Sequence, residues 1–299
     1  MQKIILGAIS IVAAAAIWAF DGIFLTPRLF NLDAALVVFM FHLIPFLLMN
    51  SFLFCQYKYL FKFSNPDYFY FFLVALFGGA LGTLAIVKAL FLVNFQQLSV
   101  ILLLQKLQPL FAIFLAIILL GEKMGRNFLS WAFLAVFSGY FLTFGFSLPN
   151  LSGGVNVLYA ALYALLAAFA FGSATVFGKK VLTKYNFKTA TFYRFFFTTI
   201  IMLIYVLVTD KINFGNITQT NWIMFLVIAL LTGIGSIFLY YHGLNKVKAS
   251  VSSILELSFP VFAVLLDYVF NKNLLSPVQL AAAAVMTLAI FKITRQQKA

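Results

Sequence analysis

The chain has 299 residues, of which 64% are hydrophobic and 9% are charged. Soluble domains carry about 25% charged residues, so this composition excludes an ordinary soluble protein and indicates an integral membrane protein. The formal net charge is +13, which would suggest a nucleic-acid partner if the basic residues formed one cluster.

The sequence lacks the residue clusters of common enzymes. A single cysteine, Cys55, excludes an intrachain disulfide and a cysteine-cluster metal site. No HExxH, Walker A or dinucleotide-binding motif is present. We therefore expect no enzymatic activity, no cofactor and no metal.

Ten apolar stretches follow one another, each long enough to cross the hydrocarbon core as a helix of about 20 residues. The first resembles the core of a signal peptide, but it continues without a small-residue cleavage site and is interpreted as an uncleaved span. The predicted spans are 4–25, 34–55, 69–91, 97–119, 128–147, 156–178, 190–209, 221–242, 249–270 and 276–293.

The Lys and Arg residues divide unevenly between the two sides of these spans. Fourteen lie on the side of the N-terminus and three on the other side, and Lys88, Lys106 and Arg194 fall within spans. The positive-inside rule then predicts that both termini are cytoplasmic and that the protein is a multi-pass protein of the cytoplasmic (inner) membrane. The basic charge is explained by topology, so we expect no nucleic acid partner.

The chain repeats itself weakly. An offset of 151 residues places Pro109 on Pro260 and Gln105 on Glu256. Further matches at this offset or at 152 are Gly82 with Gly233, Asn94 with Asn245, Ser99 with Ser250, and His42 with Arg194. The recurrence of these pairs in order predicts two similar halves, 1–148 and 152–299.

Each half contains five predicted spans, and an odd number inserts the second half upside down relative to the first. We therefore predict an all-α integral membrane fold of ten transmembrane helices in two inverted five-helix repeats. Inverted repeats are typical of secondary transporters, because two near-equivalent halves can exchange inward-open and outward-open shapes around a midplane site. Channels also contain such repeats.

Four segments resemble the drug/metabolite transporter superfamily, in particular its EamA-type members. They are WAFDGIF in the first span, KALFLVNFQQLSVILLLQKLQPLFAIFLAIILLGEK, AFAFGSATVFGKKVL, and YYHGLNKVKASVSSILELSFPVFAVLLDYVF. The resemblance covers the whole chain and implies two EamA-type repeats around a cavity lined mainly by spans one, three, four, six, eight and nine. Two features depart from the family. His42 stands in span two where an Arg is usual, although the corresponding position of the second half has an arginine, Arg194. Glu122, which ends span four, has no acidic counterpart after span nine.

Polar side chains within the spans are the candidates for a substrate site. A charged residue at a helix centre costs about 2.5–3.5 kcal/mol, so such residues usually face the interior and mark a substrate or proton path. The candidates are Asp21, His42, Lys88, Gln105, Lys106, Gln108, Arg194, His242, Glu256 and Asp267.

In the ninth span, Glu256, Pro260 and Asp267 share one helical face at about 100° per residue. The proline removes a backbone donor and frees the carbonyl group of Glu256. We expect this polar stripe to face an internal cavity, with Asp267 near its mouth. Pairing of Glu256 with Lys106 or Arg194 as a purely structural contact is the alternative, and His42 and Arg194 are expected to brace helices or line a lateral entrance.

Trp18, Phe20, Tyr240 and Tyr241 adjoin polar or glycine-rich segments. Aromatic faces beside a carboxylate suit an amine through cation–π contact, although packing or an interfacial belt would also explain them.

Together these features predict a secondary transporter for a small polar metabolite that carries an amine, such as an amino acid. We expect alternating access, with either exchange or proton coupling through Glu256 or Asp21, because burial in apolar surroundings favours the neutral form of a carboxylate. An importer of choline or another quaternary amine, a channel and a lipid flippase remain alternatives. The expected partners are a small-molecule substrate, the lipid bilayer and protons, in a monomer or homodimer.

Overall fold

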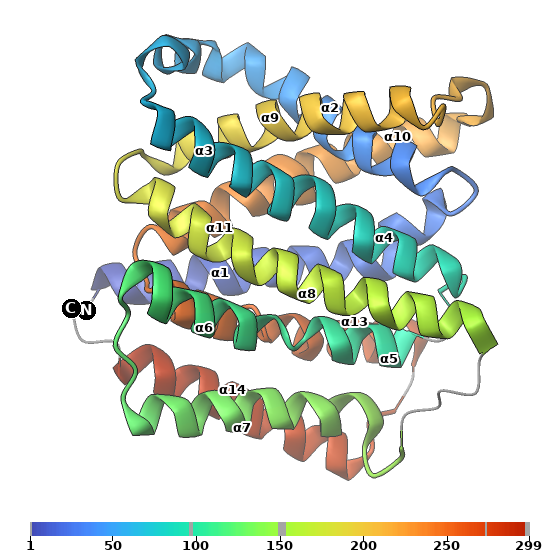
Figure 1. Cartoon of the computed structure of the whole chain (residues 1–299). Coiled ribbons are helices and arrows are strands. Elements are labelled where there is room, and N and C mark those ends of the chain that lie inside the picture. Colours follow the sequence, from blue (N-terminus) through green and yellow to red (C-terminus); the bar gives the residue numbers. More distant parts are fainter. Residues whose placement is uncertain (1, 96–97, 149–153, 273, 297–299) are drawn as a thin grey trace.

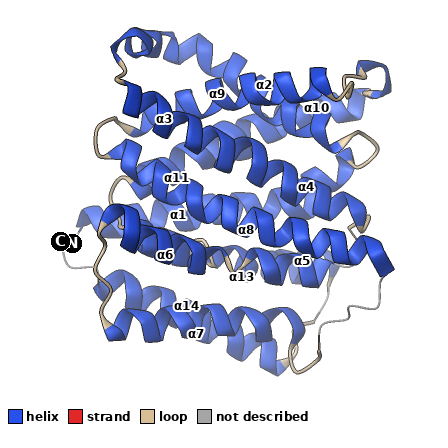
Figure 2. Ribbon diagram, viewed as in Figure 1, coloured by secondary structure: helices blue, strands red, loops and turns tan. Residues whose placement is uncertain are grey.

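The computed structural model describes residues 2–95, 98–148, 154–272 and 274–296, and every regular element in these ranges is a helix or a helical turn (Figure 2). Ten helical segments are long and apolar enough to span a membrane, which confirms the predicted number of spans. The predicted joints at residues 96–97 and 149–153 lie outside the described ranges.

The elements of the first five spans are α1 (Gln2–Phe20), η1 (Asp21–Leu25), η2 (Thr26–Leu29), α2 (Ala34–Leu53), η3 (Phe54–Lys62), α3 (Asn65–Val74), η4 (Ala75–Leu81), α4 (Gly82–Leu92), α5 (Leu98–Gln105), α6 (Gln108–Leu120) and α7 (Arg126–Phe144). The remainder are α8 (Gly154–Leu182), α9 (Phe187–Val208), η5 (Phe214–Asn216), α10 (Gln219–Ile228), η6 (Ala229–Gly235), α11 (Ser236–Leu244), α12 (Ala249–Leu255), α13 (Ser258–Asn271) and α14 (Pro277–Gln296).

The helices stack in rows along a common direction, and the start of α1 and the end of α14 lie at the same end of the bundle (Figure 1). We call this the terminal end and the opposite one the distal end. In the central rows α8 packs on α4 and α6, while α1 packs on α11 and α13. At the periphery, α7 and α14 pack mainly on each other, and they contribute little to the centre of the bundle.

The second span is longer than predicted. After α2 the chain continues as the 3₁₀ helix η3 through Lys62, where the sequence indicated a polar joint. The lower hydropathy of this segment ended the predicted span, but its backbone hydrogen bonding continues in a tighter form. Cys55 lies in this segment and is exposed.

The fourth and ninth spans are both broken near their middle. In the fourth span α5 ends at Gln105 and α6 starts at Gln108, just before Pro109. In the ninth span α12 ends at Leu255 and α13 starts at Ser258, just before Pro260. The carbonyl group of Glu256, freed by the proline, accepts a hydrogen bond from the backbone N–H of Phe259 at 3.0 Å, so the break leaves no unpaired backbone acceptor at that position.

The third and eighth spans each contain a wide π-helical turn, η4 and η6, in the glycine-rich segments that the sequence marked as close-approach sites. A Cβ atom on Gly79 would collide with the side chain of Thr198 in α9, and one on Gly233 would lie 2.7 Å from Cγ of Pro45. These glycines therefore let α9 and α2 approach their neighbours more closely than any other residue would allow.

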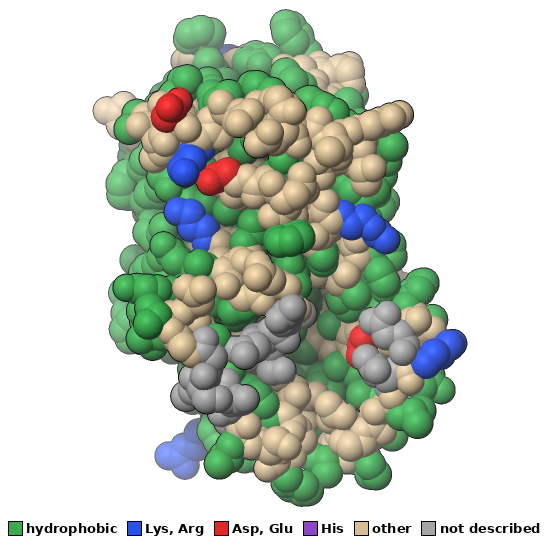
Figure 3. All heavy atoms as spheres, turned by 90° about the vertical axis from the view of Figure 1, so that its right-hand side faces the viewer, with side chains coloured by type: hydrophobic (Ala, Val, Ile, Leu, Met, Phe, Trp, Pro, Cys, Tyr) green, Lys and Arg blue, Asp and Glu red, His purple; other side chains and the backbone are tan. Residues whose placement is uncertain are grey.

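Large hydrophobic side chains cover the flanks of the bundle. Phe61, Phe133, Leu162 and Leu207 are among many that are more than half exposed. In a soluble protein such surface would promote aggregation, whereas acyl chains would cover it in a bilayer. Figure 3 shows that hydrophobic side chains also dominate the edges of the distal face, with few charged ones between them.

An ion pair fixes the terminal end of the third span. Lys184 donates to a carboxylate oxygen of Asp67 at 2.5 Å, and Tyr185 donates to the same oxygen at 2.8 Å. The hydrogen bond to Asp67 raises the pKa of Lys184 above its usual value. The contact links the start of α3 to the turn between α8 and α9.

Candidate substrate cavity

A cavity of about 290 Å³ lies among spans from both predicted halves of the chain. Its walls come from α1 and η1, α2, α4, α5, α6, α8, α9, α10, η6, α11 and the junction of α12 with α13. Nine of the eleven residues predicted for the site line it. They are Trp18, Asp21, His42, Gln105, Lys106, Gln108, Arg194, Tyr240 and Glu256.

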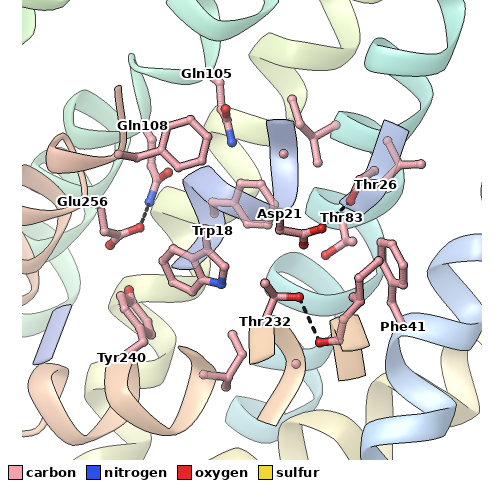
Figure 4. Close-up of a pocket in the computed structure, with 18 of the residues that line it drawn as sticks. Trp18, Asp21, Thr26, Phe41, Thr83, Gln105, Gln108, Thr232, Tyr240 and Glu256 are labelled. Atoms are coloured by element: carbon pink, nitrogen blue, oxygen red, sulfur yellow. Dashed lines mark hydrogen bonds between the residues drawn. The ribbon is translucent and has the colours of Figure 1, made fainter. Parts of the chain in front are cut away.

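Glu256 lies at the break of the ninth span, where the helix axis is interrupted. Its Oε2 accepts a hydrogen bond from Nε2 of Gln108 at 2.8 Å, which joins the two broken spans directly (Figure 4). Oε1 of Glu256 is buried and has no hydrogen-bond partner among the described residues. Among the described residues no ion pair joins Glu256 to Lys106 or Arg194, although both basic side chains line the same cavity.

Asp21 lies at the other side of the cavity, at the start of the π-helical turn η1. Its Oδ1 accepts a hydrogen bond from the hydroxyl of Thr26 at 2.8 Å. The wide turn brings residues five apart onto one face, and this places both groups on the cavity wall. Trp18 lies between Asp21 and Glu256 in Figure 4, so the two carboxylates face different parts of the same space.

The three basic candidates are held in different ways. The ammonium group of Lys106 lies 3.8 Å from the centre of the Phe259 ring, a cation–π contact. Arg194 donates to the carbonyl oxygen of Gly78 at 2.8 Å, which braces α9 against η4, while its Nε lacks a partner among the described residues. His42 donates from Nδ1 to the carbonyl oxygen of Val38, one turn back in its own helix, at 2.8 Å.

The aromatic candidates separate into two groups. The rings of Trp18 and Tyr240 lie 5.4 Å apart at an angle of 53° and form part of the cavity wall. Tyr241 is fully buried beside Tyr240 and Arg194, outside the cavity lining. Phe20 packs on the Phe24 ring at 5.1 Å and is also outside the lining. Asp267 is half-buried and is not among the lining residues.

Eight further side chains with hydroxyls or aromatic rings complete the wall and were not identified from the sequence. The hydroxyl of Thr232 bonds to the carbonyl group of Ile228 in its own helix, as threonines in any membrane helix can. The chain contains 39 phenylalanines, so no single one carried a signal. The missed residues are Thr26, Phe41, Thr83, Phe171, Thr175, Phe195, Thr232 and Phe259.

The cavity reaches toward the distal end. Its lining includes Ile23, Leu90 and Leu102 from the distal parts of their spans. Figure 3, which looks onto the distal face, shows a hollow near the middle of that face.

Toward the terminal end, polar contacts close the bundle beneath the cavity. Glu122 accepts hydrogen bonds from the backbone N–H groups of Ala249 and Ser250, at 2.7 and 3.2 Å, and from the hydroxyl of Ser250 at 2.5 Å. Lys179 donates to the carbonyl oxygen of Leu244 at 2.8 Å. These bonds join the end of α6 to α12 and α8 to α11 at the terminal end of the bundle. Among the described residues, no three potential metal ligands of the His, Cys, Asp or Glu type gather.

Comparison with known proteins agrees with this architecture. The model of the EamA-like transporter family matches residues 5–145 and again residues 158–295. The riboflavin transporter ImpX of Fusobacterium nucleatum subsp. nucleatum is 52% identical over 300 residues, which cover 99% of both chains. One solved crystal structure superposes over 99% of both chains with a TM-score of 0.69 at 12% identity, and this likeness shows the fold alone. The resemblance found in the sequence is confirmed, the protein is a membrane transporter of a small metabolite, and the chain belongs to the EamA-like transporter family.

Proposed function

We propose that the chain carries riboflavin across the cytoplasmic membrane by alternating access. The relative from Fusobacterium nucleatum carries this proposal, because its 52% identity extends over 99% of both chains and therefore over every span that forms the cavity. The name of that relative, a riboflavin transporter, supports riboflavin as the substrate.

The lining of the cavity supports a flavin. The volume of about 290 Å³ lies just below the range of typical small-molecule sites, about 300–1,000 Å³. The rings of Trp18, Phe171, Tyr240 and Phe259 offer faces for stacking on a planar tricyclic ring. The threonine hydroxyls and Asp21 offer donors and acceptors for the hydroxyls of a ribityl chain.

The charge of the cavity supports a substrate without net charge over a cationic amine such as choline. Asp21 and Glu256 are balanced by Lys106 and Arg194 in the same lining. A cationic substrate such as choline would gain from a net negative aromatic site, and here the formal charges cancel. A zwitterionic amino acid also has no net charge, so the amine-bearing substrate stays a prediction, and the relative's name favours riboflavin over it.

We also retain the predicted topology as part of the proposal, with both termini cytoplasmic. In that orientation the distal end, toward which the cavity reaches, faces the outside, and this supports an outward-facing carrier as part of the proposal. Glu256 and Asp21 are the proposed coupling residues if protons drive transport. Glu256→Gln should then lose the dependence of uptake on a pH gradient while exchange at equal pH persists, because the amide keeps an acceptor oxygen but cannot release a proton.

Binding and uptake by the purified protein test the proposal. Riboflavin should bind with quenching of its fluorescence, and proteoliposomes should accumulate labelled riboflavin in a saturable manner. Unlabelled riboflavin inside the vesicles should accelerate entry, which distinguishes a carrier from a channel. Amino acids and choline serve as competitors. Competition by one of these amines, together with a lack of riboflavin binding, would overturn the proposal and favour the amine.

A further inference from the structure

A carboxylate oxygen with no donor marks one end of the cavity. Glu256 Oε2 accepts from Gln108, whereas Oε1 is buried without a partner among the described residues. Buried polar atoms in folded proteins are almost always paired, and an unpaired one costs roughly 1–3 kcal/mol. An acceptor in this state, on the wall of a ligand cavity, is available to a donor that a ligand brings.

Donors flank this acceptor on the neighbouring span. The Gln108 amide uses one of its two N–H groups on Glu256 and retains the second. The ammonium group of Lys106 lies against the Phe259 ring, and the ion pairs found among the described residues do not include one between Lys106 and Glu256. At the junction of the two broken spans the cavity therefore presents one hydrogen-bond acceptor, Glu256, beside two hydrogen-bond donors, Gln108 and Lys106.

An aromatic wall lies beside this junction. Trp18 and Tyr240 lie next to Glu256 in Figure 4, and Gln108 approaches the carboxylate from the other side. The hydroxyl of Tyr240 is engaged with Thr175 at 2.7 Å, which fixes its ring. A flat ring stacked on this wall would direct one edge at Glu256.

The isoalloxazine ring of riboflavin has one edge with the complementary pattern. Its pyrimidine end presents a carbonyl oxygen, the N3–H group and a second carbonyl oxygen in sequence, whereas its dimethylbenzene end has no polar atom. We propose that Glu256 accepts the N3–H hydrogen bond of the flavin, with Gln108 and Lys106 donating to the two flanking carbonyl oxygens. This inference rests on the proposed riboflavin transport and adds the specificity-determining residue.

The test compares riboflavin with 3-methylriboflavin, whose N3 carries a methyl group in place of the hydrogen. Dissociation constants are measured by fluorescence quenching on the purified full-length protein. The unmodified protein should bind the methylated flavin roughly 10- to 100-fold more weakly, the range for a lost hydrogen bond to a charged group. In Glu256→Ala, riboflavin binding weakens, and the ratio of the two dissociation constants falls to about one because the acceptor for N3–H is gone.

Gln105→Ala is the matched control, since Gln105 occupies the position in the first half that corresponds to Glu256 in the second. This variant should keep the full ratio between the two flavins. Lumiflavin lacks the ribityl chain but keeps N3–H, so Glu256 should accept the same hydrogen bond from it as from riboflavin. Glu256→Ala should therefore reduce the affinity for both flavins about equally.

The outcomes separate this inference from the proposed function. Equal binding of riboflavin and 3-methylriboflavin to the unmodified protein would overturn the inference, even if Glu256→Ala does not fold. A large ratio that persists in Glu256→Ala would also overturn it. If no flavin binds while an amine does, the proposed function fails as well, and with it the inference.

Discussion

The fourth and ninth spans have a similar backbone geometry but different side chains at their breaks. Both are broken a few residues before the proline, at Pro109 and Pro260. Both end in a residue with left-handed backbone, Gly121 at φ 65° and Lys272 at φ 59°. The side chains at the breaks differ, however, because the first half places Gln105 where the second half places Glu256. The two breaks thus share their backbone geometry, while their different side chains make the two walls of the cavity unlike.

Loss of the carboxylate at the break should have the largest effect. Glu256→Ala should reduce riboflavin uptake by about 100-fold, because the unpaired acceptor and the partner of Gln108 are lost together. Gln105→Ala, the equivalent change in the fourth span, should reduce uptake by less than about tenfold. Initial rates in proteoliposomes give the comparison, and equal losses would show that the two breaks contribute alike.

A change in the charge of the fourth span should alter selectivity. Lys106→Leu installs the residue type found at the equivalent position, Leu257, and leaves the cavity with one excess negative charge. Choline should then compete with riboflavin about tenfold better than in the unmodified protein, since an uncompensated carboxylate beside aromatic rings attracts a cation. Competition binding measures the shift, with Lys123→Leu outside the cavity as control. Unchanged competition would argue against the charge balance as the source of selectivity.

The terminal ends of the two spans should also respond differently. Glu122→Ala removes the acceptor for the first N–H groups of α12, at a cost of about 1–2 kcal/mol. Hydrogen exchange of the α12 amides should accelerate about tenfold as the closed end loosens. Lys123→Ala, one residue on, should leave exchange unchanged. Exchange that stays slow in Glu122→Ala would mean that other contacts close this end.

The smallest effects are expected at the left-handed ends, and they should have opposite signs. Gly121→Ala should lower the free energy of unfolding by about 1 kcal/mol, because a Cβ atom is disfavoured at positive φ even where nothing lies within 4 Å. Lys272→Gly should raise it by a few tenths of a kcal/mol up to about 1. Thermal unfolding in detergent measures both, and a loss of stability in Lys272→Gly would contradict the strain argument.

The architecture followed from the sequence because burial in lipid has simple requirements. Ten apolar stretches gave ten spans, and ionisable residues such as Asp21 and Glu256 pointed to the cavity because they are costly elsewhere in a membrane. The π-helical turns could not be predicted, since one inserted residue hardly changes hydropathy. Cavity residues such as Phe171 and Thr232 look like any others in a membrane helix. The inverted relation of the halves and their boundaries at 148 and 152 stay predictions, to which the two breaks and the two family matches add support.

The exposed Cys55 in η3 has a practical consequence, because it is the chain's only thiol. Provided that the polar end of this span, with Lys58 and Lys62, lies in water, a membrane-impermeant maleimide attaches one fluorophore there without any engineered cysteine. If both termini are cytoplasmic, inverted vesicles should react and right-side-out cells should not. The native sequence therefore already contains a reporter of its own orientation.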